Sequence, residues 1–439
     1  MNPRPNVVLF IPHDTGCHVS PYGVKTVHTP NCERLVREGV RFAHSFCTSP
    51  LCSPARAACV TGRYPHQNGV MGLTSDMVGG FDFYPGERHA ATIFNDAGYN
   101  TVLCGFEHET PHWQKQGFQQ CLSGPGGWYN GGGDLRNHAR EIENWVKNNQ
   151  GDKPFYMQMG CHETHHAWSD FDTPPDETLG LTIPPYLKDL PEVRREVAQF
   201  QGAIRRLDDE LGNILDTFDR LGLSENTIFV FTTDHGIDFP RAKGTLYDAG
   251  TGVFLFIRYP AGNWGQGRVI DDMVSQVDLL PTLLEACGIA VPGNISGRSY
   301  LPLLEGRAYQ PNQTIFTEKT YHDTYDPSRA VRTDRYKYIR HFEVNIFQDL
   351  RLATETRRHY MKHDWRRRTL EELYDLQTDP NETHNLVADA HHQPILEKLR
   401  VSLLQWMRET QDPLLQGPVP SPHFARQLKA FNDSATKAQ

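Results

Sequence analysis

The stretch Ser49–Arg63 reads SPLCSPARAACVTGR, and it places Cys52 between two prolines and just before a short apolar run. Pro50 and Pro54 disfavour helix next to the cysteine, whereas Ala55–Val60 favours the opening of a helix. We therefore expect Cys52 at a loop-to-helix junction. First-turn amide groups at such a junction lower a thiol pKa and bind anions. The alternative is a buried structural cysteine in a bend, because free cysteines are often buried.

The composition limits the class of protein that this chain forms. With 439 residues and a hydrophobic share of 38%, the chain can bury a large core, and its length favours two or three domains. The formal net charge of -9 and a sequence pI near 6.2 argue against a general nucleic-acid-binding protein. We expect a soluble globular protein without a nucleic-acid partner, although a local basic patch could still hold a polyanion.

The cysteines and the N-terminal segment bear on the cellular compartment. The nine cysteines are odd in number and form no paired framework, so reduced thiols are expected. A strand begins within a few residues of Met1, which leaves no room for a signal peptide, and no apolar run is long enough to span a bilayer. We expect a cytoplasmic protein without a membrane partner, or one whose export signal was trimmed.

Several predicted strands end in polar residues. Val7–Ile11 is a continuous apolar run typical of a strand buried on both faces, and His13 and Asp14 follow it. Similar runs occur at Tyr99–Cys104, Phe155–Gly160 and Thr227–Thr232. Ligands of open α/β sheets bind beyond the carboxyl ends of the strands. His13 and Asp14 therefore form a candidate metal site, with a solvated turn as the alternative.

Helical segments alternate with these predicted strands. Apolar residues recur at steps of three and four in Glu192–Leu221, which predicts one long amphipathic packing helix. The alternation predicts an α/β fold with a doubly wound, mostly parallel sheet and helices on both faces. We assign residues 1–310 to this first domain.

The chain after Leu304 has a different pattern. Ala330–Arg340 and Phe342–Phe347 are short alternating segments with a basic bias, and Ile395–Glu409 has the pattern of an amphipathic helix. Residues 311–439 therefore predict a smaller α+β domain with an antiparallel sheet.

Asp14, Asp234 and His235 follow two of the predicted strands and could share one cation. Carboxylate oxygens suit Ca²⁺ or Mg²⁺, and an imidazole also admits Mn²⁺ or Zn²⁺. The pattern therefore predicts one divalent metal site at the carboxyl edge of the sheet.

The pattern Cys52-x-Pro54-x-Arg56, followed by Thr61-Gly62-Arg63, resembles the signature of the type I sulfatases. The resemblance implies an alkaline-phosphatase-like fold with a doubly wound mixed sheet. It also implies that Cys52 is oxidised to formylglycine by a formylglycine-generating enzyme or a radical maturase. In that family one hydroxyl of the hydrated aldehyde attacks sulfur, and the other later expels sulfate, which an unmodified thiol cannot do.

The resemblance covers nearly the whole chain and implies roles for individual residues. The implied catalytic residues are Cys52, Arg56, His108, His165 and Lys243. The implied metal ligands are His13, Asp14, Cys52, Asp234 and His235, around Ca²⁺ first and Mg²⁺ or Mn²⁺ as alternatives. Arg56 and Lys243 would share the sulfate charge. His165 would protonate the leaving group, and His108 would take the proton of the diol.

Two positions depart from the family pattern. The first strand usually ends in two adjacent aspartates, and here His13 stands in the first place, as a metal ligand or as a group that supports one. A lysine usually stands two residues before His108, and here Phe106 stands there. One sulfate contact is therefore missing, or it comes from another residue such as His112, Lys115 or a group of the second domain.

Several outer strings resemble the heparan N-sulfatase (sulfamidase) branch of the family. They are His66-Gln67-Asn68-Gly69, Ile237-Asp238-Phe239-Pro240, Glu372-Leu373-Tyr374-Asp375, Asp379-Pro380-Asn381-Glu382-Thr383 and Glu409-Thr410-Gln411-Asp412-Pro413. The implied partner is a sulfated saccharide, with N-sulfoglucosamine as the first choice, and a second copy in a homodimer is a further option. His322 and Arg329, in the expected basic loop Tyr321–Ala330, would contact the sugar, with a solvated loop as the alternative.

Other functions stay open at this point. One is an O-sulfatase for another sulfated sugar or an aryl sulfate. Another is a phosphonate monoester hydrolase or phosphodiesterase, because phosphate and sulfate esters share tetrahedral geometry. The third is a non-catalytic protein that binds sulfated polysaccharide, and it is suggested by Phe106 in the place of the family's lysine. Against the third stands the joint presence of the residues of a complete active site, which are Cys52, Arg56, His108, His165 and Lys243.

Overall fold

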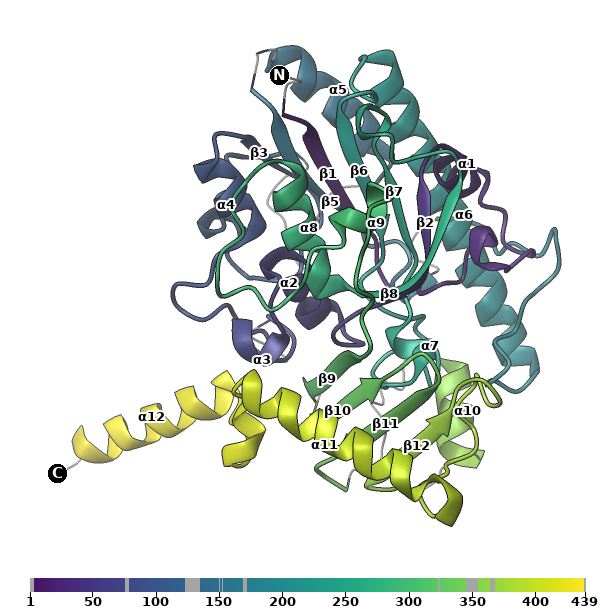
Figure 1. Ribbon diagram of the computed structural model, residues 1–439, viewed down its shortest axis with the longest axis vertical. Coiled ribbons are helices and arrows are strands. Elements are labelled where there is room, and N and C mark those ends of the chain that lie inside the picture. Colours follow the sequence, from purple (N-terminus) through teal and green to yellow (C-terminus); the bar gives the residue numbers. More distant parts are fainter. Residues whose placement is uncertain are drawn as a thin grey trace.

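The computed structural model of the protein describes residues 4–75, 79–122, 135–149, 151, 153–168, 172–322, 324–344, 354–363 and 368–437. Within these ranges the chain forms an eight-stranded sheet and a four-stranded sheet, which lie at opposite ends of the molecule (Figure 1).

The larger sheet has the strand order β4-β3-β5-β1-β6-β7-β2-β8. Its strands are β1 (Asn6–Ile11), β2 (Val40–Phe46), β3 (Asn100–Gly105), β4 (Gln120–Cys121), β5 (Phe155–Gly160), β6 (Thr227–Thr232), β7 (Leu255–Arg258) and β8 (Arg268–Ser275). Strands β4, β3, β5, β1 and β6 run parallel to one another, whereas β7 is antiparallel to both β6 and β2. The prediction of a doubly wound mixed sheet is therefore confirmed.

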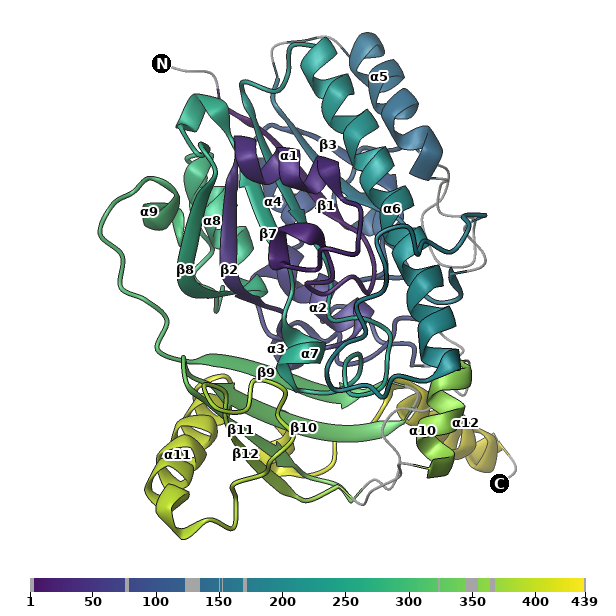
Figure 2. The ribbon, with the colours of Figure 1, turned by 90° about the vertical axis from the view of Figure 1, so that its right-hand side faces the viewer.

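Helices cover both faces of this sheet (Figure 2). One face carries α1 (Pro30–Glu38), α5 (His138–Asn148) and α6 (Pro191–Arg220). The other face carries α2 (Cys52–Thr61), α4 (Ala90–Asp96) and α8 (Leu279–Ala286). Short helices α3 (Pro65–Asn68), α7 (Asp248–Thr251) and α9 (Leu301–Leu304) lie in the connections.

The place of β1 in the sheet, between β5 and β6, explains why its sequence is apolar without interruption. Successive side chains of a strand point to opposite faces of the sheet. Phe10 packs into the core under α6, and Leu9 packs into the core under α2 and α8. Because both faces are covered, every position of Val7–Ile11 is buried.

The smaller sheet is antiparallel and has the order β12-β11-β10-β9. Its strands are β9 (Ile315–Tyr321), β10 (Tyr325–Arg332), β11 (Tyr336–His341) and β12 (Glu371–Asp375). Helix α11 (Gln393–Glu409) packs on it through Leu396, Leu399 and Leu403. Helix α10 (Glu355–His363) lies beside one end of α6 (Figure 2), and α12 (Pro422–Lys437) extends away from the body (Figure 1).

The expectation of a loop over Tyr321–Ala330 is wrong. Tyr321 ends β9, Tyr325 begins β10, and these two strands pair antiparallel in the smaller sheet. The buried positions of these strands include Lys319 and Arg329 besides apolar residues, and this hides the alternation that marks a strand. Of Phe342–Phe347, residues 342–344 follow β11 without forming a strand, and residues 345–347 lie outside the described part.

The smaller sheet packs against the loop that carries Lys243. Lys319 Nζ donates to the carbonyl oxygen of Gly244 at 3.0 Å, and Lys337 Nζ donates to that of Leu246 at 3.1 Å. The smaller sheet therefore fixes the position of this loop between β6 and α7. None of the helices in the described ranges combines the length and apolar character that a membrane crossing requires.

Candidate active site

The carboxyl ends of four parallel strands meet at one edge of the larger sheet. The polar residues that follow them are His13 and Asp14 after β1, His108 after β3, His165 after β5, and Asp234 and His235 after β6. All of these side chains except the half-buried His108 are buried. The topology therefore brings residues that are far apart in sequence to one place, as expected for an open α/β sheet.

Cys52 is the first residue of α2. Leu51 before it has extended backbone, and Gly62 ends the helix in the left-handed region with φ of 66°. Arg56 follows Cys52 by one turn, so the two side chains share a face of the helix. The predicted loop-to-helix junction is confirmed, and the exposed fraction of Cys52 is only 2%.

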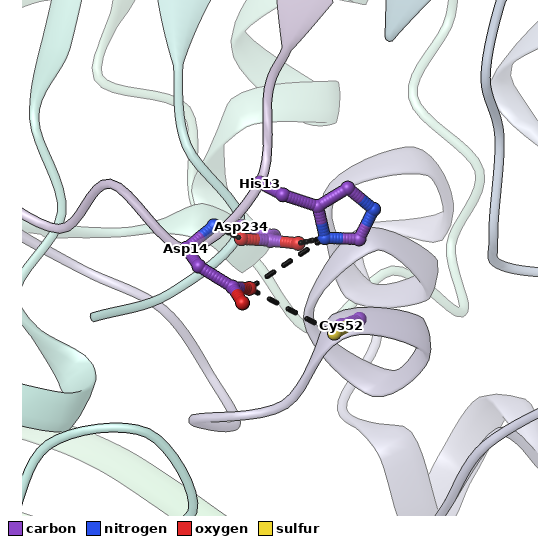
Figure 3. Close-up of side chains that lie close together, drawn as sticks. All are labelled: His13, Asp14, Cys52 and Asp234. Atoms are coloured by element: carbon purple, nitrogen blue, oxygen red, sulfur yellow. Dashed lines mark hydrogen bonds and ion pairs between the residues drawn. The ribbon is translucent and has the colours of Figure 1, made fainter. Parts of the chain in front are cut away.

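His13, Asp14, Cys52 and Asp234 form a compact buried cluster (Figure 3). One potential ligand atom from each side chain lies within 4.8 Å of the others. His13 Nδ1 is 3.0 Å from Asp234 Oδ2 and 3.6 Å from Asp14 Oδ1. Carboxylate oxygens and an imidazole nitrogen at such separations fit a divalent cation. His13 thus lies among the atoms that would bind the ion.

His235 completes this cluster from the other strand. Its Nε2 lies 3.1 Å from Asp14 Oδ1 and 3.3 Å from Cys52 Sγ. Its Nδ1 lies 2.9 Å from the carbonyl oxygen of Gly236, which accepts the ring N–H. A carbonyl that accepts from one ring nitrogen fixes the tautomer and leaves the other nitrogen as a ligand. His235 is therefore oriented to present Nε2 to the cation and to residue 52.

Two basic side chains face the same cluster. Arg56 Nε is 3.1 Å from Asp234 Oδ2, and its Nη2 donates to the carbonyl oxygen of Pro12 at 2.8 Å. Lys243 Nζ donates to Asp14 Oδ2 at 2.6 Å. Both are almost completely buried, so their charge is poorly screened and available to an anion.

These charges act on residue 52. Burial raises the pKa of the Cys52 thiol and Asp14 adds to this, but Lys243 and His235 outweigh both and hold that pKa well below its usual value. A negative charge on the side chain of residue 52 is therefore stabilised by the site.

His165 and His108 approach residue 52 from neighbouring strands. Burial, together with the charge of Lys243, lowers the pKa of His165 to about 3. Burial also lowers the pKa of His108, although a hydrogen bond with Cys52 opposes the change. His165 Nδ1 donates to the carbonyl oxygen of His166, and its Nε2 lies 3.9 Å from Asp14 Oδ2. Both imidazoles are thus neutral near pH 7, with one nitrogen able to accept a proton.

Phe106 and His13, which depart from the family pattern, contact each other. Their ring centroids are 4.7 Å apart, and the Arg56 guanidinium lies 5.4 Å from the centroid of Phe106. The family pattern has an aspartate and a lysine at these positions, so the two departures remove opposite charges from adjacent places. Burial and Arg56 lower the pKa of His13, but Asp234 and hydrogen bonds with Asp14 and Asp234 outweigh them and raise it to about 9, so a positive charge is favoured at this position.

Arg329 is predicted to contact the sugar, but its side chain is directed to other partners and does not reach the site. Arg329 is fully buried in β10, where Nε and Nη2 bind the two carboxylate oxygens of Asp412 at 2.6 and 3.0 Å. Nε also lies 3.2 Å from Glu318 Oε2. The guanidinium group of Arg329 is therefore engaged by two buried carboxylates instead of a substrate. His322 follows β9 directly and is also buried, with an exposed fraction of 5%, so neither residue forms the expected loop surface.

The structure places two residues at the site that sequence reasoning missed. Asp238 Oδ2 lies 3.6 Å from Lys243 Nζ, and Arg357 of α10 pairs with Asp238 Oδ1. Burial raises the pKa of Asp238, but Arg357 and Lys243 hold that pKa at about 2. The only sequence signal was the string that contains Asp238. No pattern around Arg357 indicated its position.

The mixed sheet and the strand-end site on it define an alkaline-phosphatase-like α/β fold. Within this class, the chain belongs to the sulfatase family, whose sequence profile matches residues 5–289. A second profile, described as N-sulphoglucosamine sulphohydrolase, C-terminal, matches residues 239–352.

Individual relatives agree with this placement. Human N-sulphoglucosamine sulphohydrolase is 27% identical over 94% of this chain and 92% of its own length. An ulvan-active sulfatase of Formosa agariphila is 27% identical over 98% of this chain and 86% of its own length. Among solved structures, the phosphonate monoester hydrolase of Agrobacterium radiobacter has a TM-score of 0.71 at 19% identity, over 93% of this chain and 96% of its own. At that identity the structural likeness concerns the fold alone.

Proposed function

We propose that this protein hydrolyses a sulfate ester or sulfamate of a glycosaminoglycan-type sugar, with N-sulfoglucosamine as the first substrate. The observation that carries the proposal is the position of Cys52 at the start of α2, with His235 Nε2 at 3.3 Å and the charges of Lys243 and Arg56 around it. A tetrahedral anion in this place meets helix amide groups and two buried cations.

Residue 52 would act as formylglycine, made from Cys52 by a maturation enzyme. Its hydrate would supply a geminal diol, in which one hydroxyl attacks sulfur and the second expels sulfate. His108, which hydrogen-bonds Cys52, would accept the proton of that second hydroxyl. Lys243 and Arg56 would neutralise the sulfate oxygens.

His165 would deliver a proton to the leaving group. Its pKa is low because the imidazole is buried beside Lys243, and a bound sulfate would offset the lysine charge and raise that pKa. The hydrogen bond from Nδ1 to the carbonyl of His166 leaves Nε2 directed toward the reacting atoms.

A divalent cation fits the buried donor set and would supply a Lewis acid for a sulfate oxygen. Asp14, Asp234, His235 and His13 would hold it beside residue 52. We propose Ca²⁺ first and Mg²⁺ as an alternative because of the carboxylate oxygens, and the two imidazoles also admit Mn²⁺.

The choice of N-sulfoglucosamine is supported by the C-terminal profile match and by the human relative that carries this name. Two observations favour alternatives. The ulvan-active relative is equally similar, which supports an O-sulfatase of another sugar. The phosphonate monoester hydrolase shares the fold, which supports a hydrolase of phosphorus esters.

The test is hydrolysis by protein that is co-expressed with a formylglycine-generating enzyme. Release of sulfate is measured from N-sulfoglucosamine, from O-sulfated monosaccharides and disaccharides, and from an aryl sulfate, and a phosphonate monoester is included. We expect the highest kcat/KM with N-sulfoglucosamine and no turnover by the Cys52→Ala variant. Preference for an O-sulfated sugar would replace the substrate but keep the reaction. Turnover of the phosphonate alone would overturn the proposal.

A further inference from the structure

Lys243 is held by two carboxylates. Its Nζ lies 2.6 Å from Asp14 Oδ2 and 3.6 Å from Asp238 Oδ2, and all three side chains are buried. Asp14 also lies 3.1 Å from His235 and belongs to the cluster that fits a cation. An ion bound there would be coordinated by the carboxylate oxygens of Asp14, which would weaken the hydrogen bond between Asp14 and Lys243. Asp238 would then be the anchor that keeps Lys243 in place.

Asp238 is itself fixed by the C-terminal part of the chain. Its Oδ1 pairs with Arg357 Nη2, so its two oxygens have separate partners, Arg357 on one side and Lys243 on the other. Potential ligand atoms of Asp238, His165 and Asp14 lie within 4.8 Å of one another. The carboxylate therefore borders the place where the leaving group would lie.

Helix α10, which carries Arg357, is attached to α6 of the larger domain (Figure 2). Glu196 Oε1 accepts from the backbone N–H groups of Glu355 and Thr356 at 2.8 and 3.3 Å. His359 Nδ1 lies 2.9 Å from Glu192 Oε1. A carboxylate at the first-turn amide groups stabilises the start of a helix. Arg357 therefore stands on a helix with a defined position and not on a free loop.

We propose that Arg357 and Asp238 are positioning residues that hold Lys243 against the sulfate of the substrate. Arg357 fixes Asp238, and Asp238 holds the lysine amine when Asp14 is engaged by the cation. The inference rests on the proposed function, and it gives the C-terminal part of the chain a role in sulfate binding instead of sugar recognition. The effect should therefore be the same for every sulfated substrate.

The experiment compares Arg357→Met, Arg357→Lys and Asp238→Asn with wild-type protein in which formylglycine is quantified. Steady-state kinetics use an aryl sulfate and N-sulfoglucosamine, and inorganic sulfate serves as a competitive inhibitor. Lys362→Met is the matched control, because Lys362 is an exposed basic residue of the same helix.

We expect Arg357→Met and Asp238→Asn to lower kcat/KM by roughly 10- to 100-fold on both substrates, as for other groups that orient active-site residues. The inhibition constant of sulfate should rise by a similar factor, Arg357→Lys should recover part of the loss, and Lys362→Met should match wild type. A loss confined to the sugar, or an unchanged inhibition constant, would overturn the inference.

Two further comparisons keep the outcomes apart. If Arg357→Met is unfolded by its melting temperature, the more conservative Asp238→Asn and Arg357→Lys variants decide by the same criteria. Wild-type protein that contains formylglycine but hydrolyses no sulfated compound would overturn the proposed function. Active wild type with an equally active Asp238→Asn variant would overturn only the positioning role.

Discussion

Cys52 Sγ lies 3.3 Å from His235 Nε2, and this contact joins the first residue of α2 to the end of β6. The two residues are 183 positions apart in the sequence, yet they share Asp14 as a neighbour, at 3.9 Å from the sulfur and 3.1 Å from the imidazole. The side chain at position 52 therefore lies in contact with the proposed cation site.

Activity should depend on oxidation of Cys52. Peptide mass spectrometry of co-expressed protein should show formylglycine or its hydrate at position 52, and specific activity should rise in proportion to that fraction. The reason is that only a geminal diol can release sulfate by elimination. Cys17→Ser, which changes a half-buried cysteine outside the cluster, should keep the activity. Full turnover by Cys52→Ala would rule out this chemistry.

Metal content should depend on the two buried carboxylates. Asp14→Asn and Asp234→Asn should each lose the ion after dialysis, measured by elemental analysis, and with it the sulfate-releasing activity, because each removes charge and a donor at the centre of the cluster. Asp209→Asn, an exposed carboxylate on α6, is the control and should retain one ion per chain. Stoichiometric metal in an Asp14→Asn/Asp234→Asn double variant would place the ion elsewhere.

His13 and Phe106 should behave as a coupled pair. Phe106→Lys alone buries a second cation beside Arg56, and His13→Asp alone adds a third carboxylate next to Asp14 and Asp234. The double variant restores the charge pair of the family pattern and should lose less activity than the two single effects predict. For residues in contact, a coupling energy of about 0.5–3 kcal/mol is expected from the double-mutant cycle. Additive effects on kcat/KM would show that the two departures are independent.

The two histidines should fail in different steps. His108→Ala should accumulate a covalent sulfated form of residue 52, seen as a mass increase of the intact protein, because the diol proton has no acceptor. His165→Ala should slow substrates with poor leaving groups by about 10²–10⁴-fold while sparing an activated aryl sulfate. An equal loss on both kinds of substrate would contradict a proton-donating role for His165.

Arg329 should matter for stability and not for the substrate. Arg329→Ala leaves the carboxylates of Asp412 and Glu318 buried without their cation, which costs about 3–5 kcal/mol of unfolding free energy for a buried pair. Urea denaturation measures this loss. Arg194→Ala, which breaks a pair with Asp189 that is exposed on both sides, should leave the midpoint nearly unchanged. If the Arg329→Ala variant had wild-type stability but an altered KM for the sugar, Arg329 would contact the substrate after all.

The parts of the site that sequence predicts well have local signals. Val7–Ile11 and Thr227–Thr232 are apolar runs with polar residues directly after them, and a parallel sheet gathers such ends at one edge. The motif around Cys52 likewise specifies a helix start within a few residues. These features do not depend on knowing how distant segments pack.

The remaining parts depend on packing between distant segments. Arg357 reaches Asp238 only because α10 docks on α6, and no local pattern records that contact. For Arg329 the local sequence misleads, because a basic residue near a turn is usually exposed. Only the fold shows that Arg329 is buried beside Glu318 and Asp412.

The complete burial of Cys52 sets an order of events during synthesis. A maturation enzyme, which we propose as a partner, must reach the thiol before β6 and the Lys243 loop close over it. At about 5–20 residues per second, the roughly 190 residues between Cys52 and Lys243 take about 10–40 s to emerge from the ribosome. In the maturation that we propose, oxidation therefore competes with folding, and faster translation or a limiting supply of the enzyme would leave part of the population unmodified.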